Sequence, residues 1–295
     1  MIDLGISIIN YKTKELTAQC LKSIFDKNWN IKYKVFLVDN NSQDGSLKFL
    51  KEKFPLAHFQ ENNENLGFAG GHDSILPKIE ARYILVLNSD TKINSGVLDK
   101  MVEFMDQKPA MGIASCKIFD FEGKLQPNAG NLPYGLALIT WLFNLEPLGL
   151  KRQSFHIEDS KFYEDFHLVG WVSGSFLLIK KEVVDKVGYF DRNYFMYFED
   201  VDLCDRVAKA GFEIGINPNV SVDHLSGGSS DNPKLRQWLG ESRGLVTFCR
   251  LRFNKLFSFL IKLLVYKATF LRMIAFALVG KFNYAKTYAK VFISL

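Results

Sequence analysis

The chain has 295 residues, of which 47% are hydrophobic and 23% charged, values typical of a globular protein with enough core for one or two domains. Its four scattered cysteines, without a C-x-x-C pair or zinc spacing, favour a reducing compartment and argue against a disulfide scaffold. The net charge is +5, but residues 234–295 contain twelve Lys or Arg and one acid (+11), so residues 1–233 carry −6 (+5 minus +11). We therefore predict a body over residues 1–233 and a basic tail over residues 234–295.

The first third of the chain alternates strand and helix signals. Apolar runs predict strands over residues 4–9, 35–38, 58–60, 83–87 and 111–117, and capped or amphipathic segments predict helices over residues 14–26, 45–53, 71–79 and 95–107. This order predicts an α/β fold in which a mostly parallel central sheet carries helices on both faces. Ligands of such sheets bind beyond the carboxyl ends of the strands, where this chain places polar residues.

The first two strands end in polar residues that can face a nucleotide. Asn10 and Tyr11 follow the first strand, and Asp39 to Ser42, including Asn41, follow the second. A carboxylate at Asp39 can accept hydrogen bonds from a base or ribose. The alternative is an Asx residue that forms the turn, which is common after strands.

A glycine-rich stretch from Asn65 to His72, with Gly67, Phe68 and Gly70, precedes the predicted helix over residues 71–79. Glycines let backbone N–H groups approach a phosphate or sugar, and the helix start favours anions. The stretch is neither G-x-G-x-x-G nor a P-loop, so a dinucleotide or ATP site is not favoured. The alternative is a tight loop without a ligand.

The strand ending at Leu87 is followed by Asn88-Ser89-Asp90, whose acid can hold a divalent cation against a diphosphate. We predict Mg²⁺ or Mn²⁺ at Asp90, with His224 as a candidate second protein ligand. The alternative for His224 is a structural histidine that follows a strand.

Residues 128–163 are predicted to be irregular, and a strand over residues 174–180 and a helix over residues 181–187 follow. Just before that strand, Trp171 offers a flat face on which an acceptor sugar can stack, near Ser173 and Gly174. The alternative for Trp171 is a core residue.

Glu199 and Asp200 begin a predicted helix over residues 200–210, which precedes a strand over residues 213–216. The helix N-terminus favours negative charge, whereas the preceding aromatic residues desolvate the acids and raise their pKa. These aromatic residues are Tyr189, Phe190, Tyr194, Phe195, Tyr197 and Phe198. Under both influences a carboxylate can act as a general base near neutral pH. The alternative is an ordinary helix cap.

The tail is apolar between Lys255 and Gly280, but its longest charge-free run, residues 273–280, is too short to span a membrane. We predict one or two amphipathic helices that lie on an anionic membrane surface. The alternatives are packing on the body or a homodimer interface. Nucleic-acid binding is not expected, because no recognition module is present. No basic segment precedes the first apolar run, so we expect a cytoplasmic protein, peripheral on the cytoplasmic face of the membrane.

In their order, these motifs resemble the inverting glycosyltransferase family 2, which has the GT-A fold. The resemblance extends from about Asp3 to Ser229 and is most similar to the bacterial rhamnosyltransferase-like branch, which builds surface polysaccharide. It rests on Ile8 to Tyr11, Val38 to Ser42, Asn65 to Gly71, Leu87 to Asp90, Ser173 to Phe176 and Tyr197 to Leu203.

The resemblance implies a nucleotide-sugar-binding half over residues 1–120 and an acceptor-binding and catalytic half over residues 121–233. It implies that Asp39 contacts the nucleotide base, that Asp90 of a D-x-D-like motif is the metal ligand, and that Asp200 is the catalytic base. His224 matches a histidine that helps to bind metal in some relatives. Asn88 stands where many relatives have the first Asp, so Asp90 carries more of the metal affinity.

The implied activity is transfer of a sugar, with inversion, from dTDP-rhamnose or a UDP-sugar to a hydroxyl of a glycan or lipid-linked acceptor. Glu199 either binds acceptor hydroxyls or fixes the loop. One rival is a sugar-nucleotide pyrophosphorylase, which needs a basic glycine-rich loop after the first strand, where this chain has Asn10-Tyr11-Lys12-Thr13. The other is a non-catalytic nucleotide-sugar-binding protein of the same fold, against which the retained Asp90 and Asp200 argue.

Overall fold

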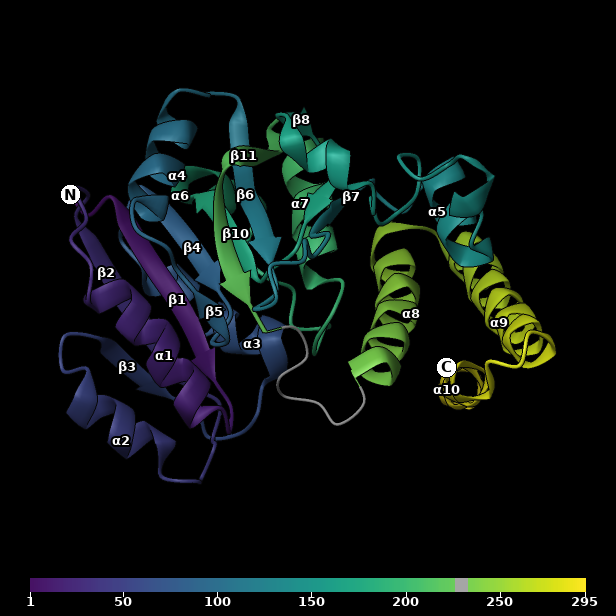
Figure 1. Cartoon of the computed structure of the whole chain (residues 1–295), viewed down its shortest axis with the longest axis horizontal. Helices are drawn as coiled ribbons and strands as arrows, with labels where there is room; N and C mark the ends of the chain where they lie inside the picture. Colours follow the sequence, from purple (N-terminus) through teal and green to yellow (C-terminus); the bar gives the residue numbers. More distant parts are fainter. Residues whose placement is uncertain (226–232) are drawn as a thin grey trace.

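The structure is a computed structural model that describes residues 1–225 and 233–295. The segment Ser226 to Ser229, at which the predicted resemblance ends, lies outside the described residues. In this part of the chain the central sheet has nine strands (Figure 1). They are β1 (Leu4–Asn10), β2 (Tyr33–Asp39), β3 (His58–Glu61), β4 (Tyr83–Leu87), β5 (Thr91–Lys92), β6 (Met111–Phe119), β8 (His167–Leu168), β10 (Phe176–Lys180) and β11 (Glu213–His224).

The strand directions bring the polar ends together at one edge of the sheet. The order is β3-β2-β1-β4-β10-β6-β11-β5, with β8 beside β11. Strands β1 to β4 are parallel, as are β6 and β11, whereas β10 is antiparallel to β4 and β6, and β5 is antiparallel to β11. The carboxyl ends of the parallel strands therefore share an edge with the amino ends of β10 and β5, as a GT-A fold requires.

Helices cover both faces of the sheet because strand side chains alternate between two cores. One core joins Leu85 and Leu87 of β4 to α1 (Lys14–Phe25), α2 (Ser46–Lys53) and α4 (Val97–Asp106). The other joins Ile84 and Val86 to α3 (Gly67–Asp73), α6 (Lys181–Val187) and α7 (Glu199–Lys209). The prediction of a mostly parallel sheet between helices is confirmed.

The segment over residues 128–163 is more regular than predicted. It contains β7 (Ala129–Gly130), which pairs with β9 (Trp171–Val172), and α5 (Gly135–Phe143). Short 3₁₀ turns are η1 (Leu76–Lys78), η2 (Glu146–Leu148) and η3 (Ser160–Glu164). The α5 residues are apolar on nearly every side, which obscures helical periodicity in the sequence, and the helix packs against the C-terminal helix α9 (Lys255–Leu278) (Figure 1).

The C-terminal region forms three helices, α8 (Pro233–Arg252), α9 and α10 (Phe282–Ser294). Between Lys255 and Gly280, where one or two helices were predicted, the structure has one, α9, and α8 and α10 lie outside that range. Helix α8 contributes Leu245 and Phe248 to the core that also contains α7, so the basic region is joined to the body through α8. Across residues 1–225 and 233–295, no helix is long and apolar enough to cross a membrane.

Candidate active site

Asp90 and His224 meet at the sheet edge, because Asp90 precedes β5 and His224 ends the neighbouring strand β11. The Nε2 atom of His224 lies 3.2 Å from Oδ1 of Asp90 and accepts a hydrogen bond from Nδ2 of Asn88 at 3.0 Å. The other ring nitrogen, Nδ1, donates to Oε1 of Gln126 at 2.9 Å. A ring nitrogen of His224 and a carboxylate oxygen of Asp90 therefore face each other.

Two electron-rich atoms that face each other in this way fit a divalent cation. Adjacent ligands of an octahedral ion with bonds of about 2.0–2.1 Å lie roughly 3 Å apart. Gln126 fixes the ring of His224 through this hydrogen bond, as an outer partner does for metal-ligating histidines in general. Within the described ranges no group of three or more His, Cys, Asp or Glu is arranged to hold a metal, so Asp90 and His224 alone form an incomplete ligand set.

A short chain of contacts connects this pair to Asp200. The backbone N–H of Asn88 donates to the carbonyl of Ser175 at 3.1 Å. The adjacent residue, Gly174, donates its N–H to Oδ2 of Asp200 at 3.0 Å. A second N–H, of Val201, donates to Oδ1 at 2.8 Å. The two acids, separated by 110 positions in the sequence, therefore lie at the same edge of the sheet on either side of the start of β10.

Burial changes the proton affinity of the acids at the start of α7. It raises the pKa of Asp200, against the lowering effect of the two backbone N–H donors. It also raises the pKa of Glu199 well above its ordinary value, and the charge of Asp200 adds to this effect. Glu199 is 4% exposed, and in the part of the chain that the structure describes its Oε2 has no hydrogen-bond partner. Both shifts make these carboxylates stronger proton acceptors than ordinary ones.

The turn before α7 is strained, because Tyr197 (φ 72°) and Phe198 (φ 76°) both adopt left-handed conformations. Such conformations cost about 1–3 kcal/mol each in non-glycine residues and persist only where surrounding structure imposes them. Phe198 is buried and stacks on Phe155, with ring centroids 5.3 Å apart. The turn places Glu199 and Asp200 at the helix N-terminus, as predicted.

Asn10 is not available to a ligand, which corrects one prediction. It is completely buried, and its Nδ2 donates to Asp39, Ser42 and Ser46. Asp39 is 2% exposed and accepts further hydrogen bonds from the side chain and the backbone of Ser42. Asn10 is therefore the centre of a buried polar network, and Asp39 forms the turn. Contact of Asp39 with a nucleotide base stays a prediction.

Around this network, three of the other residues predicted to bind nucleotide-sugar, Tyr11, Asn41 and Asn65, lie closer to solvent, whereas Gly67 and Gly70 are buried. Tyr11 is exposed. The side chain of Asn41 donates to the carbonyl of Asn63 at 2.9 Å. Asn65 accepts from the backbone N–H of Gly67 at 3.0 Å.

The glycine-rich stretch forms helix α3 itself rather than a loop before a helix, which corrects the predicted bounds of 71–79. A Cβ at Gly71 would lie 2.7 Å from Ile9, one at Gly70 would lie 2.9 Å from Leu66, and one at Gly67 would overlap Phe195. The N–H of Phe68 donates to the carbonyl of Phe195 at 2.7 Å, so it does not bind a phosphate. These glycines permit close packing.

This packing brings Phe68 close to Asp200. A Cβ added at Gly174 would lie 2.8 Å from Cζ of Phe68 and 3.9 Å from Oδ2 of Asp200. The α3 segment is thus joined to the same edge of the sheet as Asp200. Ser173, also predicted near the acceptor, is half-buried, and its hydroxyl lies 3.0 Å from that of Ser175.

Trp171 is a core residue, which corrects its prediction as a stacking platform. It is 5% exposed, its Nε1 donates to the carbonyl of Phe155 at 2.9 Å, and its ring stacks on that of Phe155. Gln126 and His156 were not predicted. They approach the site only through contacts distant in sequence, such as that between Gln126 and His224, so no local pattern marks them.

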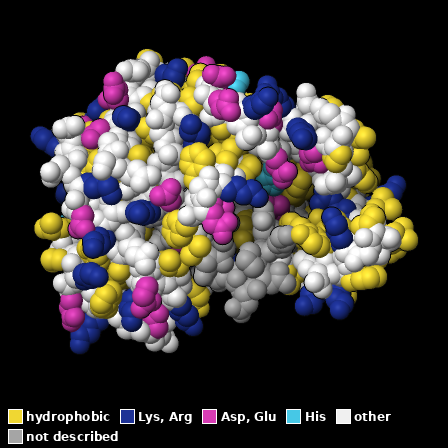
Figure 2. Space-filling view, in the orientation of Figure 1, with side chains coloured by type: hydrophobic (Ala, Val, Ile, Leu, Met, Phe, Trp, Pro, Cys, Tyr) yellow, Lys and Arg dark blue, Asp and Glu magenta, His cyan; other side chains and the backbone are white. Residues whose placement is uncertain are grey.

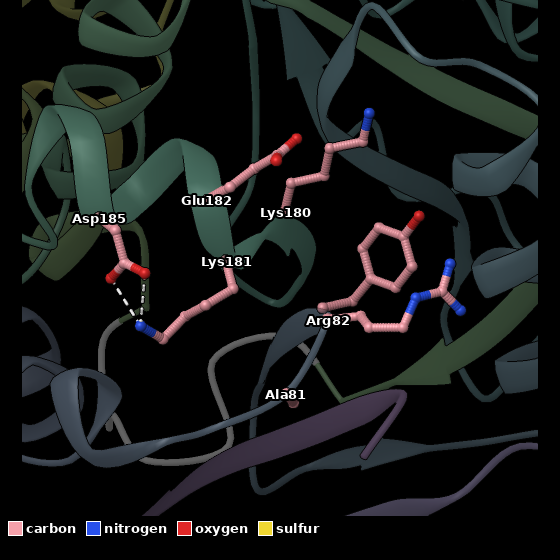
Figure 3. A pocket seen from close by; sticks show the side chains of 7 residues that line it. Ala81, Arg82, Lys180, Lys181, Glu182 and Asp185 are labelled. Carbon is pink, nitrogen blue, oxygen red and sulfur yellow. Dashed lines mark hydrogen bonds and ion pairs between the residues drawn. The ribbon is translucent and has the colours of Figure 1, made fainter. Parts of the chain in front are cut away.

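Two surface pockets lie at the opposite edge of the sheet from Asp90 and Asp200. One, of about 450 Å³, is lined by Arg82 and Tyr83 at the start of β4 and by Lys180 and Lys181 at the end of β10 (Figure 3). Its cations have protein partners, since Lys181 pairs with Asp185 and Lys180 donates to the carbonyl of Pro109 at 2.6 Å. The other pocket adjoins it at Ala81 and Lys181. The two lysines of the pocket in Figure 3 are therefore already engaged by the protein.

An α/β sheet with acidic residues at the carboxyl ends of its parallel strands is the arrangement in which such folds bind their ligands. A family model described as glycosyl transferase family 2 matches residues 6–188, which is more than half of the sequence. The chain belongs to this family. The match ends before Asp200 and His224, so their placement comes from the structure.

Similar curated proteins include rhamnosyltransferases. N-acetylglucosaminyl-diphospho-decaprenol L-rhamnosyltransferase of Mycobacterium tuberculosis is 28% identical over 206 residues, which cover 64% of this chain and 66% of that protein. Rhamnosyltransferase WbbL of Escherichia coli is 24% identical over 168 residues, which cover 56% of this chain and 60% of that protein. Both matches span less than two thirds of the relative's length. They confirm the predicted similarity to the rhamnosyltransferase-like branch.

Similar solved structures confirm the GT-A fold. Mannosyltransferase PcManGT from Pyrobaculum calidifontis, in complex with GDP-Man and Mn²⁺, has a TM-score of 0.60 at 15% identity and covers 99% of this chain and 83% of its own. S. aureus TarS 1-349 in complex with UDP-GlcNAc has a TM-score of 0.59 at 15% identity and covers 98% and 79%.

Proposed function

We propose that the protein is an inverting glycosyltransferase that moves a sugar from a nucleotide diphosphate to an acceptor hydroxyl. The observation that carries this proposal is the contact path from Asp90 and His224, through Asn88 and Ser175, to Asp200. Such a transfer needs a group that binds a cation beside the departing diphosphate and a group that accepts the proton of the acceptor hydroxyl. The two groups must lie on opposite sides of the anomeric carbon. Family membership supports the same activity.

In the proposed reaction, Asp200 accepts the proton of the acceptor hydroxyl while the oxygen of that hydroxyl bonds to the anomeric carbon. The bond to the diphosphate breaks on the opposite face, so the configuration inverts. The N–H groups of Gly174 and Val201 fix the direction of the Asp200 carboxylate. A positioned base contributes about 10²–10⁴-fold to such a step.

Asp90 and His224 would hold Mg²⁺ or Mn²⁺ together with oxygen atoms of the donor diphosphate. A bound ion stabilises the negative charge on the departing diphosphate. The Mn²⁺ in the PcManGT structure supports the choice of metal. Because the described part of the chain supplies two protein ligands, we expect metal and donor to bind cooperatively, since each completes the site of the other.

A thermal-shift panel tests the donor and the metal together. We expect a nucleotide diphosphate sugar with Mn²⁺ to raise the Tm more than the two separate shifts combined, and His224→Gln to remove this excess. His58→Gln is the control, because His58 is an exposed histidine on β3. Additive shifts in the wild type would contradict a shared site, and the donor that gives the largest shift identifies the nucleotide and sugar.

The relatives favour a rhamnosyl donor and a lipid-linked acceptor in cell-surface polysaccharide synthesis. The mycobacterial protein is by name a rhamnosyltransferase of N-acetylglucosaminyl-diphospho-decaprenol. Another relative, from Haloferax volcanii, is named as a hexosyltransferase of low-salt glycan biosynthesis, so a hexosyl donor is the alternative. We propose that dTDP-rhamnose and UDP-hexoses are the donors to test first.

A lipid-linked acceptor fits the surface of the C-terminal helices, which we propose to be a peripheral membrane-docking face on the cytoplasmic side. We define this docking face by the exposed apolar side chains of α9 and α10, which include Leu256, Phe259, Leu260, Leu278 and Phe282. Residues 255–295 contain seven Lys or Arg and no acid. Figure 2 shows hydrophobic and basic side chains side by side at this end of the molecule. This combination favours an anionic lipid surface.

A further inference from the structure

Helix α8 packs directly against the strained turn that carries the candidate base. A Cβ at Gly240 would overlap the ring of Tyr197, and one at Gly244 would lie 2.5 Å from Cβ of Phe198. Only glycine at these two positions lets the helix approach so closely. The left-handed conformations of Tyr197 and Phe198 are therefore held in place by α8.

An ion pair fixes the same helix to α7. Arg252 of α8 donates to both carboxylate oxygens of Asp202, at 2.7 and 2.8 Å. Asp202 is completely buried and lies two residues after Asp200. A bidentate pair of this kind adds geometric specificity as well as energy. The position of α8 relative to Asp200 is thus determined at both the turn and the helix.

On the face between these anchors, Glu241 of α8 meets His156 from the segment before β8. Oε1 of Glu241 lies 3.3 Å from Nε2 of His156 and accepts a hydrogen bond from Gln237 at 2.9 Å. The side chains of His156 and Glu241 are 23% and 10% exposed. The imidazole also lies edge-on to the ring of Trp171, with centroids 5.3 Å apart. Neither side chain belongs to the site derived above.

The charge of Glu241 acts on both Asp200 and His156. Burial is the largest cause of the raised pKa of Asp200, and the negative charge of Glu241 raises it further. Burial lowers the pKa of His156, but the charge and hydrogen bond of Glu241, with the charges of Glu158 and Asp200, raise it overall. The charges of four side chains therefore influence one another: Glu199, Asp200, Glu241 and His156. Of these, Glu241 comes from α8.

We propose that Glu241 and His156 are positioning residues for proton transfer to Asp200. Glu241, next to Gly240 on the helix that packs against Tyr197, strengthens Asp200 as a proton acceptor, and its carboxylate orients the His156 ring at 3.3 Å. This inference rests on the proposed transferase function. It extends the active site onto a helix that lies beyond residues 6–188, the part matched by the family model.

The first test is the pH dependence of kcat/KM for the acceptor at saturating donor. We expect Glu241→Gln to move the acid limb to lower pH, because Asp200 loses a neighbouring negative charge, and Glu241→Asp to restore most of the wild-type profile. Glu158→Gln is the matched control, because it removes an exposed acid near His156 and should leave the acid limb unchanged. A merely structural role of Glu241 would lower kcat without moving the limb, and that result would overturn the proposal.

The second test needs no turnover. Carboxyl and imidazole titrations followed by NMR in the folded wild type and Glu241→Gln should show lower midpoints for both Asp200 and His156 in the variant. Identical midpoints would overturn the inference. If Glu241→Gln does not fold, Glu241→Ser, which also removes the charge, takes its place, and unchanged Asp200 and His156 midpoints in that variant would overturn the inference. A wild type that transfers no sugar from any nucleotide donor defeats the proposed function, whereas the titrations still decide the inference.

Discussion

At the residue scale, the carboxylate of Asp200 is fixed by two backbone donors, and its pKa is raised by burial. We expect Asp200→Asn to lower kcat by about 10²–10⁴-fold, because an amide cannot accept the proton, while the donor Kd stays nearly unchanged. Initial rates and calorimetry measure the two quantities. Asp165→Asn, at an exposed acid after η3, is the control and should change neither. Turnover of Asp200→Asn close to that of the wild type would reject the role of Asp200 as the base.

Glu199 makes the stability of the protein depend on pH. Its pKa is raised in the folded state, so its contribution to stability is complete below the unfolded pKa and is lost as the pH rises through the folded pKa. Glu199→Gln removes a buried charge that lacks a full set of partners, which is worth about 1–3 kcal/mol. We expect Glu199→Gln to raise the Tm at pH 8 but not at pH 4, as measured by thermal melts at the two pH values. An equal effect at the two pH values would contradict this assignment.

At the scale of elements, the attachment of α8 depends on a buried charge. Removing one partner of a buried pair costs about 3–5 kcal/mol, because the other charge remains uncompensated. We expect Arg252→Met to lower the free energy of unfolding by an amount near the lower end of that range, because Arg206 still donates to Asp202 at 2.9 Å. Arg250→Met, at an exposed arginine of the same helix, should stay within about 0.5 kcal/mol. Chemical denaturation measures both, and equal losses would argue against the buried pair.

The elements that carry the site were largely predictable, because apolar runs mark buried strands and polar residues mark their ends. Three features were not. The glycines of α3 read as a loop because their packing partners, such as Phe195, are far away in sequence. Helix α5 lacks a polar face, and the burial of Asn10 depends on Ser42 and Ser46. Each of these features depends on contacts that only the folded chain creates.

At the scale of the whole molecule, the docking face predicts binding to anionic vesicles. We expect the full chain to float with liposomes that contain phosphatidylglycerol, and the double change Leu256→Glu and Leu260→Glu to reduce binding at least about ten-fold, because it removes apolar area and adds repulsive charge. Leu56→Glu is the control at an exposed leucine of the body. If the double variant instead converts a dimer to a monomer and the wild type does not float, the face is a homodimer interface.

The antiparallel placement of β10 between β4 and β6 has a consequence for how this enzyme family can diversify. Strand β6 ends, and β10 begins, at the same rim, so the 56 residues from 120 to 175 leave and return at fixed anchor points. Insertions or deletions between these anchors would resize the wall beside Asp200 without changing the register of β4, β6 and β10. If Asp200 faces the acceptor, as we propose, acceptor choice can evolve through that segment while strands β1 to β4 keep their framework.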